Sequence, residues 1–352
     1  MSQFYQLKIA SIKRITPSAV TVTFEIPENL KSIFQFTPGQ YITIKKTLNG
    51  KELRRSYSIC SAPSENTISI GIKEIINGTF SVFANQELKE NDTLEVFPPE
   101  GRFTYKIDAA STKTIGAFVA GSGITPVMSI MKTVLAEEPN NTFVLTYGNR
   151  SLAETMFNEE LISLINQYPE RLKVHYIFSR SEEADSLFGR IEHGTVNYVV
   201  KNKHKEVNFD SFYLCGPEHM IKTVEETLLE NGYKEEQIHH ELFTSAVAGN
   251  EEELEEQLEG QTTVTIMLDD EETTFVMSQK EVVLDAALNH DLDPPYSCQG
   301  GICSSCVARI TKGAAKMAKN QILTDGEIAD GLILTCQAHP TTATLKIDYD
   351  DV

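Results

Sequence analysis

The sequence predicts a multidomain protein with an antiparallel β-barrel, an α/β domain built on a parallel sheet, and a small α+β domain. Three observations support this fold class. The chain has 352 residues with 41% apolar content, whereas single domains typically run roughly 100 to 200 residues. Near Thr112 the hydrophobic pattern changes from short strands to strands that alternate with helices. An acidic segment at 246–260, AVAGNEEELEEQLEG, then separates the last stretch, 261–352.

The first region, 1–106, consists of short alternating or β-branched runs separated by Pro, Gly and Asn. Such runs are typical of strands in an antiparallel barrel or sandwich. They are AVTVTFEI (19–26), QYITIKK (40–46), TISIGIKE (67–74) and DTLEVFPP (92–99).

The second region, 107–245, alternates apolar strands with helical stretches, which predicts a parallel sheet covered by helices. Its strands are TIGAFVAG (114–121), TFVLTYG (142–148), KVHYIFSR (173–180) and FYLCG (212–216), and its helical stretches are 126–138, 154–168 and 217–232. The acidic segment 246–260 is interpreted as a solvated linker. In 261–352 we predict a hairpin over 262–277, a helix over 280–291 and a last strand over 342–350.

Charge and cysteine usage exclude several classes of function. The formal net charge of −19 argues against nucleic-acid binding and favours a basic partner, with most of the negative charge in the last third of the chain. Apolar runs such as 115–121 are far shorter than the roughly 20 residues of a membrane helix, and the N-terminus lacks the apolar segment of a signal peptide. We therefore expect a soluble, cytoplasmic protein without stable membrane association, whose six cysteines are not disulfide-bonded.

Four of the six cysteines have the spacing of metal ligands. Cys298, Cys303 and Cys306 follow the pattern C-x4-C-x2-C, and Cys336 lies further along. This is the spacing of plant-type [2Fe-2S] ferredoxins, in which three thiolates come from one loop and the fourth from a distant segment. A zinc site is one alternative, but it usually has two C-x2-C pairs and this chain has one. Inert core cysteines are the other alternative.

Two stretches of the first region have the chemistry of a flavin nucleotide site. RRSYSICSAP (54–63) combines a cation, an aromatic ring and hydroxyl groups at a strand end. GTFS (78–81) precedes a predicted helix over 80–88, whose first N–H groups are suited to a phosphate. An ordinary surface strand and an ordinary helix cap are the alternatives.

The second region contains turns suited to a dinucleotide. GSGITP (121–126) follows an apolar strand and precedes a helix, with Pro126 in place of the third glycine of the usual fingerprint. CGPEHM (215–220) repeats the strand, turn and helix arrangement. SRS (179–181) ends another strand at the edge where α/β folds bind ligands, and its alternative is a solvated loop. ELF (241–243) closes the parallel-sheet region just before the acidic segment. Simple core packing is the alternative to a role in the site.

These motifs occur in an order that resembles the ferredoxin–NADP reductase superfamily fused to a plant-type ferredoxin. The order is PGQY (38–41), RSYS (55–58), GTFS, GSGITP, CGPEHM and the four-cysteine pattern. The resemblance covers essentially the whole chain. It implies an FAD-binding β-barrel domain over 1–106, an NADP-binding α/β domain over 107–245 and a β-grasp [2Fe-2S] ferredoxin domain over 261–352.

The resemblance also implies roles for individual residues. FAD would be bound by Arg55, Ser56, Tyr57, Ser58, Gly78, Phe80 and Ser81. The nicotinamide dinucleotide would be bound by Gly121, Gly123, Thr125, Cys215 and Gly216, with Phe243 over the flavin, so that Ser58, Cys215 and Phe243 lie nearest the reaction. Arg150, Ser179 and Arg180 would form a 2′-phosphate pocket that selects NADPH over NADH, and Cys298, Cys303, Cys306 and Cys336 would bind the iron.

The activity that the resemblance implies is transfer of electrons from NADPH through FAD and a [2Fe-2S] cluster to an oxygenase. Several stretches are similar to the fused members that reduce a diiron epoxidase complex acting on an aryl-CoA: ELF before an acidic linker, PYSCQGGICSSC (295–306), 317–340 and IDYDDV (347–352). A Rieske ring-hydroxylating dioxygenase, a membrane desaturase or a hybrid-cluster protein are the alternative acceptors. A redox-sensing or zinc-binding regulator is the alternative of a different class. Gln299 departs from the family, since many plant-type ferredoxins carry a basic residue there.

Overall fold

The computed structural model describes residues 3–243 and 260–352. The chain divides after Phe243 into two compact units, each with its own hydrophobic core. The predicted acidic linker, 246–260, lies outside the described residues apart from Gly260.

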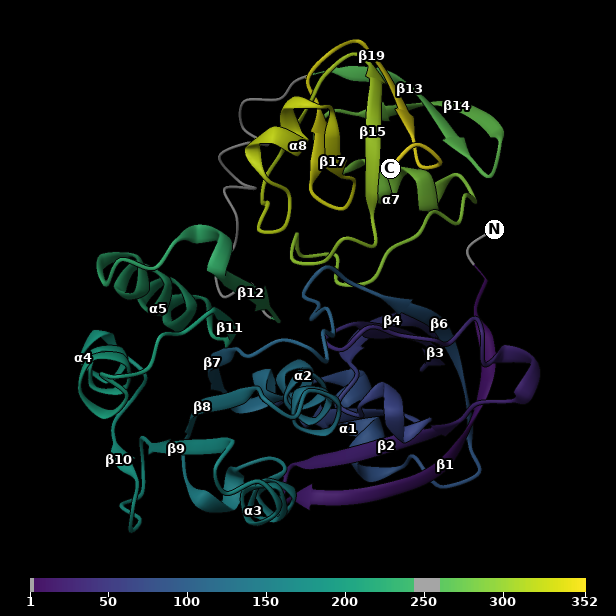
Figure 1. Ribbon diagram of the computed structural model, residues 1–352. Helices are drawn as coiled ribbons and strands as arrows, with labels where there is room; N and C mark the ends of the chain where they lie inside the picture. Colours follow the sequence, from purple (N-terminus) through teal and green to yellow (C-terminus); the bar gives the residue numbers. More distant parts are fainter. Residues whose placement is uncertain (1–2, 244–259) are drawn as a thin grey trace. The chain divides into compact units, whose positions relative to one another are not determined.

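A six-stranded antiparallel sheet forms the first half of the unit Phe4–Phe243 (Figure 1). Its strand order is β4-β3-β6-β1-β2-β5. Beyond the end of β4, Ile59 forms a bridge with Ile70 of β5, so the two edges of the sheet meet. The elements are β1 (Tyr5–Thr16), β2 (Ala19–Glu25), β3 (Tyr41–Leu48), β4 (Lys51–Ser58), β5 (Ile68–Lys73), α1 (Thr79–Gln86) and β6 (Thr93–Glu100). The predicted antiparallel fold is confirmed, although β1 was missed because a register shift after Ile9 interrupts its alternating pattern.

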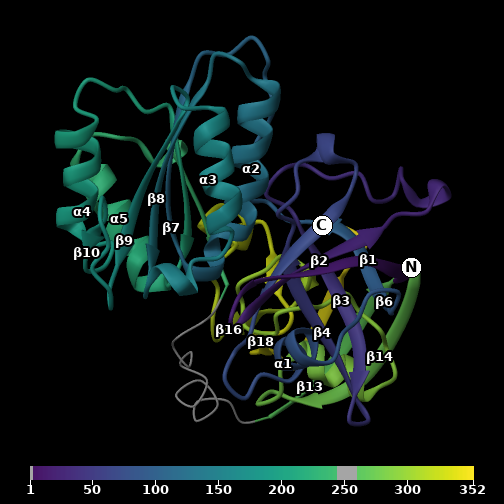
Figure 2. The same ribbon diagram turned by 90° about the horizontal axis from the view of Figure 1, so that it is seen from below.

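The second half of this unit is a six-stranded parallel sheet, as predicted. Its order is β10-β9-β8-β7-β11-β12, and helices cover both faces, with α2 and α3 on one and α4 and α5 on the other (Figure 2). The strands are β7 (Thr114–Ala120), β8 (Thr142–Asn149), β9 (Leu172–Phe178), β10 (Leu187–Phe188), β11 (Ser211–Gly216) and β12 (Ile238–Leu242). The helices are α2 (Ile124–Glu137), α3 (Asn158–Gln167), α4 (His193–Asn197) with its continuation η5 (Tyr198–Lys203), and α5 (Glu218–Glu230).

The strand order of this sheet determines where a ligand can bind. The chain moves outward from β7 through β8 and β9, then returns to the other side of β7 with β11, so the strand order reverses between β7 and β11. Ligands of open α/β sheets bind at such a switch point, outside the carboxyl ends of the strands.

The helix predicted from residue 154 begins only at Asn158, because Phe157 adopts a left-handed conformation with φ 61°.

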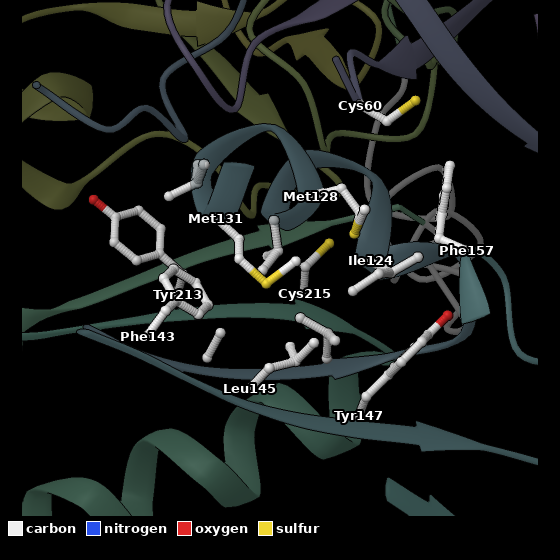
Figure 3. Close-up of a cluster of buried hydrophobic side chains, with 14 of the residues drawn as sticks. Cys60, Ile124, Met128, Met131, Phe143, Leu145, Tyr147, Phe157, Tyr213 and Cys215 are labelled. Atoms are coloured by element: carbon white, nitrogen blue, oxygen red, sulfur yellow. The ribbon is translucent and has the colours of Figure 1, made fainter. Parts of the chain in front are cut away.

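The barrel and the parallel sheet share one apolar cluster. Cys60 from the barrel packs in the same cluster as Met128 of α2 and Cys215 of β11 (Figure 3). Polar contacts join the same elements: the Ser129 hydroxyl donates to the Ser61 carbonyl oxygen over 2.7 Å, and the ammonium of Lys132 lies 2.6 Å from a carboxylate oxygen of Glu65. This continuous interface holds the two halves of the unit together.

The unit that contains 260–352 has a five-stranded mixed sheet in the order β14-β13-β19-β15-β17. The predicted hairpin is confirmed, with Asp269 and Asp270 both left-handed at its tip, as a two-residue type I′ turn requires. The elements are β13 (Gln261–Leu268), β14 (Glu271–Ser278), α7 (Val283–Asn289), β15 (Val307–Lys312), β16 (Ala315–Met317), α8 (Asp325–Ala329), β17 (Leu332–Leu334), β18 (Ala338–Pro340) and β19 (Thr344–Asp348).

Candidate redox site

The residues expected to bind the flavin lie on β4 and at the start of α1. Arg55, Ser56, Tyr57 and Ser58 are the last residues of β4. The Tyr57 and Phe80 rings lie with their centroids 5.7 Å apart, which brings the strand and the helix to one place. Burial raises the pKa of Tyr57, although the Arg55 guanidinium opposes this, so the ring remains a neutral phenol. An exposed cation and a neutral aromatic ring at adjoining positions fit a flavin phosphate and an isoalloxazine ring.

The start of α1 depends on Gly78. A Cβ placed there would lie 2.4 Å from the hydroxyl oxygen of Ser81, so a larger residue would displace the Ser81 side chain. In the observed arrangement the Ser81 hydroxyl accepts a hydrogen bond from the backbone N–H of Ile75 over 3.1 Å. This contact ties the preceding loop to the first turn of the helix, whose free N–H groups form a site suited to a pyrophosphate.

The glycine turn predicted to bind the dinucleotide lies at the switch point of the parallel sheet. Gly121 has φ 56°, and a Cβ there would have no neighbour within 4 Å, so this side of the turn is open. At Gly123, in contrast, a Cβ would lie 2.3 Å from the carbonyl oxygen of Cys215, so only glycine allows the turn to approach the end of β11. The Thr125 hydroxyl donates to the Ser122 carbonyl oxygen over 3.0 Å and braces the turn.

Gly216, the last residue of β11, is equally constrained. A Cβ at this position would lie 2.7 Å from the terminal methyl of Met220 and 3.2 Å from Ala120, the last residue of β7. The structure therefore brings the predicted GSG and CGP motifs side by side at the carboxyl ends of β7 and β11.

Ser58, Cys215 and Glu241 form a group that joins the barrel to the parallel sheet. The Ser58 hydroxyl donates to a carboxylate oxygen of Glu241 over 3.3 Å, and Glu241 pairs with Cys215 across β11 and β12. Burial raises the pKa of Glu241 to about 8, while the Ser58 hydrogen bond lowers it. Burial and the Glu241 carboxylate raise the pKa of Cys215 well above its ordinary value, so this thiol stays protonated.

Glu241 was missed at the sequence level. In the ELF motif the sequence points only to Phe243, which follows β12, is half-buried and packs against the shared apolar cluster. The sequence did contain a sign that Glu241 is unusual, because it is an acidic residue within β12, the short edge strand of the parallel sheet. Its significance depends on Ser58, which lies 183 positions earlier.

The three residues of the predicted 2′-phosphate pocket meet at a different part of the same sheet edge. The backbone N–H of Ser179 donates to the Asn149 carbonyl oxygen over 3.0 Å, and that of Arg180 donates to the Arg150 carbonyl oxygen over 2.9 Å. The ends of β8 and β9 are thus held together, and both arginine side chains are exposed. Two exposed guanidinium groups at neighbouring positions suit a phosphate, since each offers paired N–H donors.

The four cysteines with ligand spacing come together in the second unit. Hydrogen bonds from Cys303 and Cys336 lower the pKa of the Cys298 thiol and raise the pKa of both donors, and Cys336 also contacts Cys306. The thiols form a chain of contacts from Cys303 through Cys298 and Cys336 to Cys306. Four clustered thiols fit a two-iron cluster, which four cysteines hold between them.

Gln337, which the sequence analysis did not single out, connects the two segments that carry the cysteines. Its side-chain amide donates to the Gln299 carbonyl oxygen over 3.1 Å and to the Cys336 carbonyl oxygen over 2.9 Å. Gln299 has φ 53°, an uncommon conformation for a non-glycine residue, and its carbonyl is held by this contact. Gly301 is also required, because a Cβ there would lie 2.8 Å from the Lys319 carbonyl oxygen.

Three family models match the chain. They are the oxidoreductase FAD-binding domain over residues 6–105, the oxidoreductase NAD-binding domain over 118–226 and the 2Fe-2S iron-sulfur cluster binding domain over 266–341. Together with the fold and the site, these matches define an oxidoreductase that uses FAD, a nicotinamide nucleotide and a [2Fe-2S] cluster. None of the helices in the described residues is long and apolar enough to cross a membrane.

Curated relatives span the whole chain. The chain is 36% identical over 352 residues to a subunit of the 1,2-phenylacetyl-CoA epoxidase of Escherichia coli K12, covering 99% of both chains. It is 31% identical to the ferredoxin reductase component of 3-ketosteroid-9-alpha-monooxygenase from Rhodococcus rhodochrous, covering 97% of this chain and 96% of the relative. The chain belongs to the ferredoxin–NADP reductase superfamily, in the group whose members carry a fused [2Fe-2S] ferredoxin domain.

A solved structure has the same fold. Phthalate dioxygenase reductase matches with a TM-score of 0.63 at 23% identity, and the match covers 98% of each chain. The predicted fold class, an antiparallel flavin domain, a parallel nucleotide domain and a ferredoxin domain, is therefore confirmed.

Proposed function

We propose that this reductase takes electrons from NADPH and delivers them to an oxygenase, and that the oxygenase is a diiron epoxidase acting on phenylacetyl-CoA. The observation that carries the choice of acceptor is the E. coli relative, 36% identical over 99% of both chains. The choice of NADPH rests on the exposed guanidinium groups of Arg150 and Arg180 at the ends of β8 and β9.

The chain's own residues bind, orient and shield the reacting groups. Tyr57 and Phe80 form an aromatic wall, and the N-terminus of α1 beyond Gly78 supplies free N–H groups for a pyrophosphate. The turn at Gly121 and Gly123 would hold the dinucleotide at the switch point, and Phe243 would lie against the flavin. FAD and the cluster, when bound, supply the change from two-electron to one-electron chemistry.

Between the two nucleotide sites, the protein keeps its own groups neutral. Cys215 stays a thiol, and near pH 7 a carboxyl oxygen of Glu241 holds a proton, since its pKa is about 8. A neutral lining at this point would keep a fixed negative charge away from a flavin bound there. Geometry, not a strong base, then governs the rate of hydride transfer.

The proposed domain limits are 1–106, 107–245 and 261–352, and the cluster ligands are Cys298, Cys303, Cys306 and Cys336. The contacts of these four thiols with one another support their assignment.

The acceptor is tested by reconstitution. Purified holoprotein is combined with NADPH and the oxygenase subunits of 1,2-phenylacetyl-CoA epoxidase, and epoxidation of phenylacetyl-CoA is followed together with NADPH oxidation. Product formation in step with NADPH oxidation supports the proposal. Ready reduction of ferricyanide without any epoxidation would overturn the acceptor while leaving the reductase chemistry intact.

A second candidate acceptor is a steroid monooxygenase. It is favoured by the 31% identity with the reductase component of 3-ketosteroid-9-alpha-monooxygenase. The same reconstitution with the oxygenase of that system separates the two candidates, because each oxygenase forms its own product.

A further inference from the structure

Tyr147 of β8 lies under the glycine turn at the switch point. The side chain is fully buried within the shared apolar cluster. In Figure 3 its hydroxyl is directed toward the segment that carries Phe157. A phenol hydroxyl enclosed by apolar side chains needs a hydrogen-bond partner, so its partners show what this tyrosine holds in place.

The shorter hydrogen bond of Tyr147 reaches the glycine turn. Its hydroxyl donates to the Gly121 carbonyl oxygen over 3.0 Å, and the same oxygen also accepts the backbone N–H of Ile124. The peptide between Gly121 and Ser122 is planar and trans, so its carbonyl and its N–H point in opposite directions. Drawing the carbonyl into the core therefore turns the Ser122 N–H outward, on a turn whose Gly121 side is open.

The longer contact of Tyr147 reaches the segment before α3. Its hydroxyl lies 3.4 Å from the Met156 carbonyl oxygen. The side chains of Met156 and Phe157 pack against Gly71 of the flavin barrel, where a Cβ would lie 3.1 Å from each. The hydroxyl thus lies between the glycine turn, to which it donates, and a segment that rests on the flavin domain.

We propose that Tyr147 is a positioning residue for the nicotinamide dinucleotide. Its hydroxyl orients the Gly121–Ser122 peptide so that the Ser122 N–H would face the pyrophosphate. The proposal rests on the dinucleotide site proposed above, and it adds a buried residue that the dinucleotide does not touch.

The test uses Tyr147→Phe holoprotein, which keeps the ring and removes only the hydroxyl. Anaerobic stopped-flow reduction of the flavin is measured over a series of NADPH concentrations, and in parallel with NADH. Loss of one neutral hydrogen bond should raise the Kd of both nucleotides roughly two- to tenfold. The saturating rate, the flavin content and the iron–sulfur spectrum should remain those of the wild type, because the hydroxyl reaches neither cofactor site directly.

Two further variants separate the possible failures. Tyr213→Phe removes another tyrosine hydroxyl of the same cluster, which donates to the Thr104 carbonyl oxygen over 3.3 Å, and its Kd should remain unchanged. Gly121→Ala strains the turn itself and should weaken nucleotide binding. If Gly121→Ala weakens binding while Tyr147→Phe binds as the wild type does, Tyr147 is not a positioning residue. If neither variant changes the Kd, the proposed dinucleotide site is wrong as well.

Discussion

Ser58 of the flavin barrel and Glu241 of the nucleotide domain are joined by a hydrogen bond of 3.3 Å across the domain boundary. Ser58 is the last residue of β4, and Glu241 is the last but one of β12, where it pairs with the buried Cys215. The contact places a carboxyl group with a pKa of about 8 between the two predicted nucleotide sites.

The raised pKa of Glu241 predicts a stability change with pH. Below about pH 4.5 the carboxyl is protonated in both the folded and the unfolded chain, so it has no effect. From there to about pH 8 only the unfolded chain ionises, so folding is progressively disfavoured, and above pH 8 the loss is complete.

Glu241→Gln does not ionise, so its melting temperature should rise relative to the wild type between these pH values and then level off. The rise of the pKa from 4.5 to about 8 corresponds to on the order of a few kcal/mol, or roughly 5–15 °C. Calorimetry across pH 4 to 9 measures the difference. A difference that does not change with pH would show that Glu241 titrates normally.

Removing the Ser58 hydroxyl should change the same titration. The Ser58 hydrogen bond lowers the pKa of Glu241, so Ser58→Ala should move the step in the stability curve to a higher pH. Ser61→Ala is the matched control, because this buried hydroxyl donates to the Thr67 carbonyl oxygen within the barrel. An equal shift in both variants would mean that the effect does not come from the contact with Glu241.

The pair of arginines predicts nucleotide preference. Arg180→Gln should weaken NADPH binding about tenfold through loss of a charge-assisted hydrogen bond, while NADH binding should change by less than about twofold, since NADH has no 2′-phosphate. Lys201→Gln, in the last turn of η5, controls for a general loss of positive charge. Equal weakening of both nucleotides would remove Arg180 from a 2′-phosphate pocket.

The cluster cysteines should separate two stages of electron transfer. Cys303→Ser should leave the reduction of the flavin by NADPH intact and abolish transfer to the oxygenase. Cys60→Ser is the control, since this thiol donates to the Ser69 carbonyl oxygen in the barrel and a hydroxyl can do the same. Rapid-mixing absorption measures the first stage and product formation the second. Loss of both stages in Cys303→Ser would contradict the assignment.

The Gln337 amide should determine how long the cluster is retained. Gln337→Leu removes two hydrogen bonds, to Gln299 and Cys336, so the cluster should be lost to a chelator about tenfold faster. Gln279→Leu removes comparable amide contacts with Thr262 and Thr342 and should retain the cluster as the wild type does. Decay of the iron–sulfur absorption measures both variants. Equal decay rates in the two variants would show that the hydrogen bonds of Gln337 play no part in retaining the cluster.

Contiguous motifs were predictable from the sequence, and contacts between distant residues were not. The strand, turn and helix at 114–138 and the spacing of the four cysteines are local patterns, so the fold class and the cofactors followed from them. Glu241 and Gln337 were missed because their partners, Ser58 and Gln299, lie 183 and 38 positions away. Tyr147 resembled any other core residue of a buried strand, since only the folded chain brings its hydroxyl to Gly121.

Electrons are expected to pass from the nicotinamide through the flavin to the cluster. This route is tested by anaerobic addition of NADPH to the purified holoprotein, followed by absorption spectroscopy. In the wild type the flavin band and the iron–sulfur bands should both bleach. In Cys303→Ser the flavin band should bleach as well, and the intensity of the iron–sulfur bands should follow the amount of iron that this variant retains. A colourless protein that contains zinc, or flavin bleaching with a wild-type cluster left oxidised, would contradict the account.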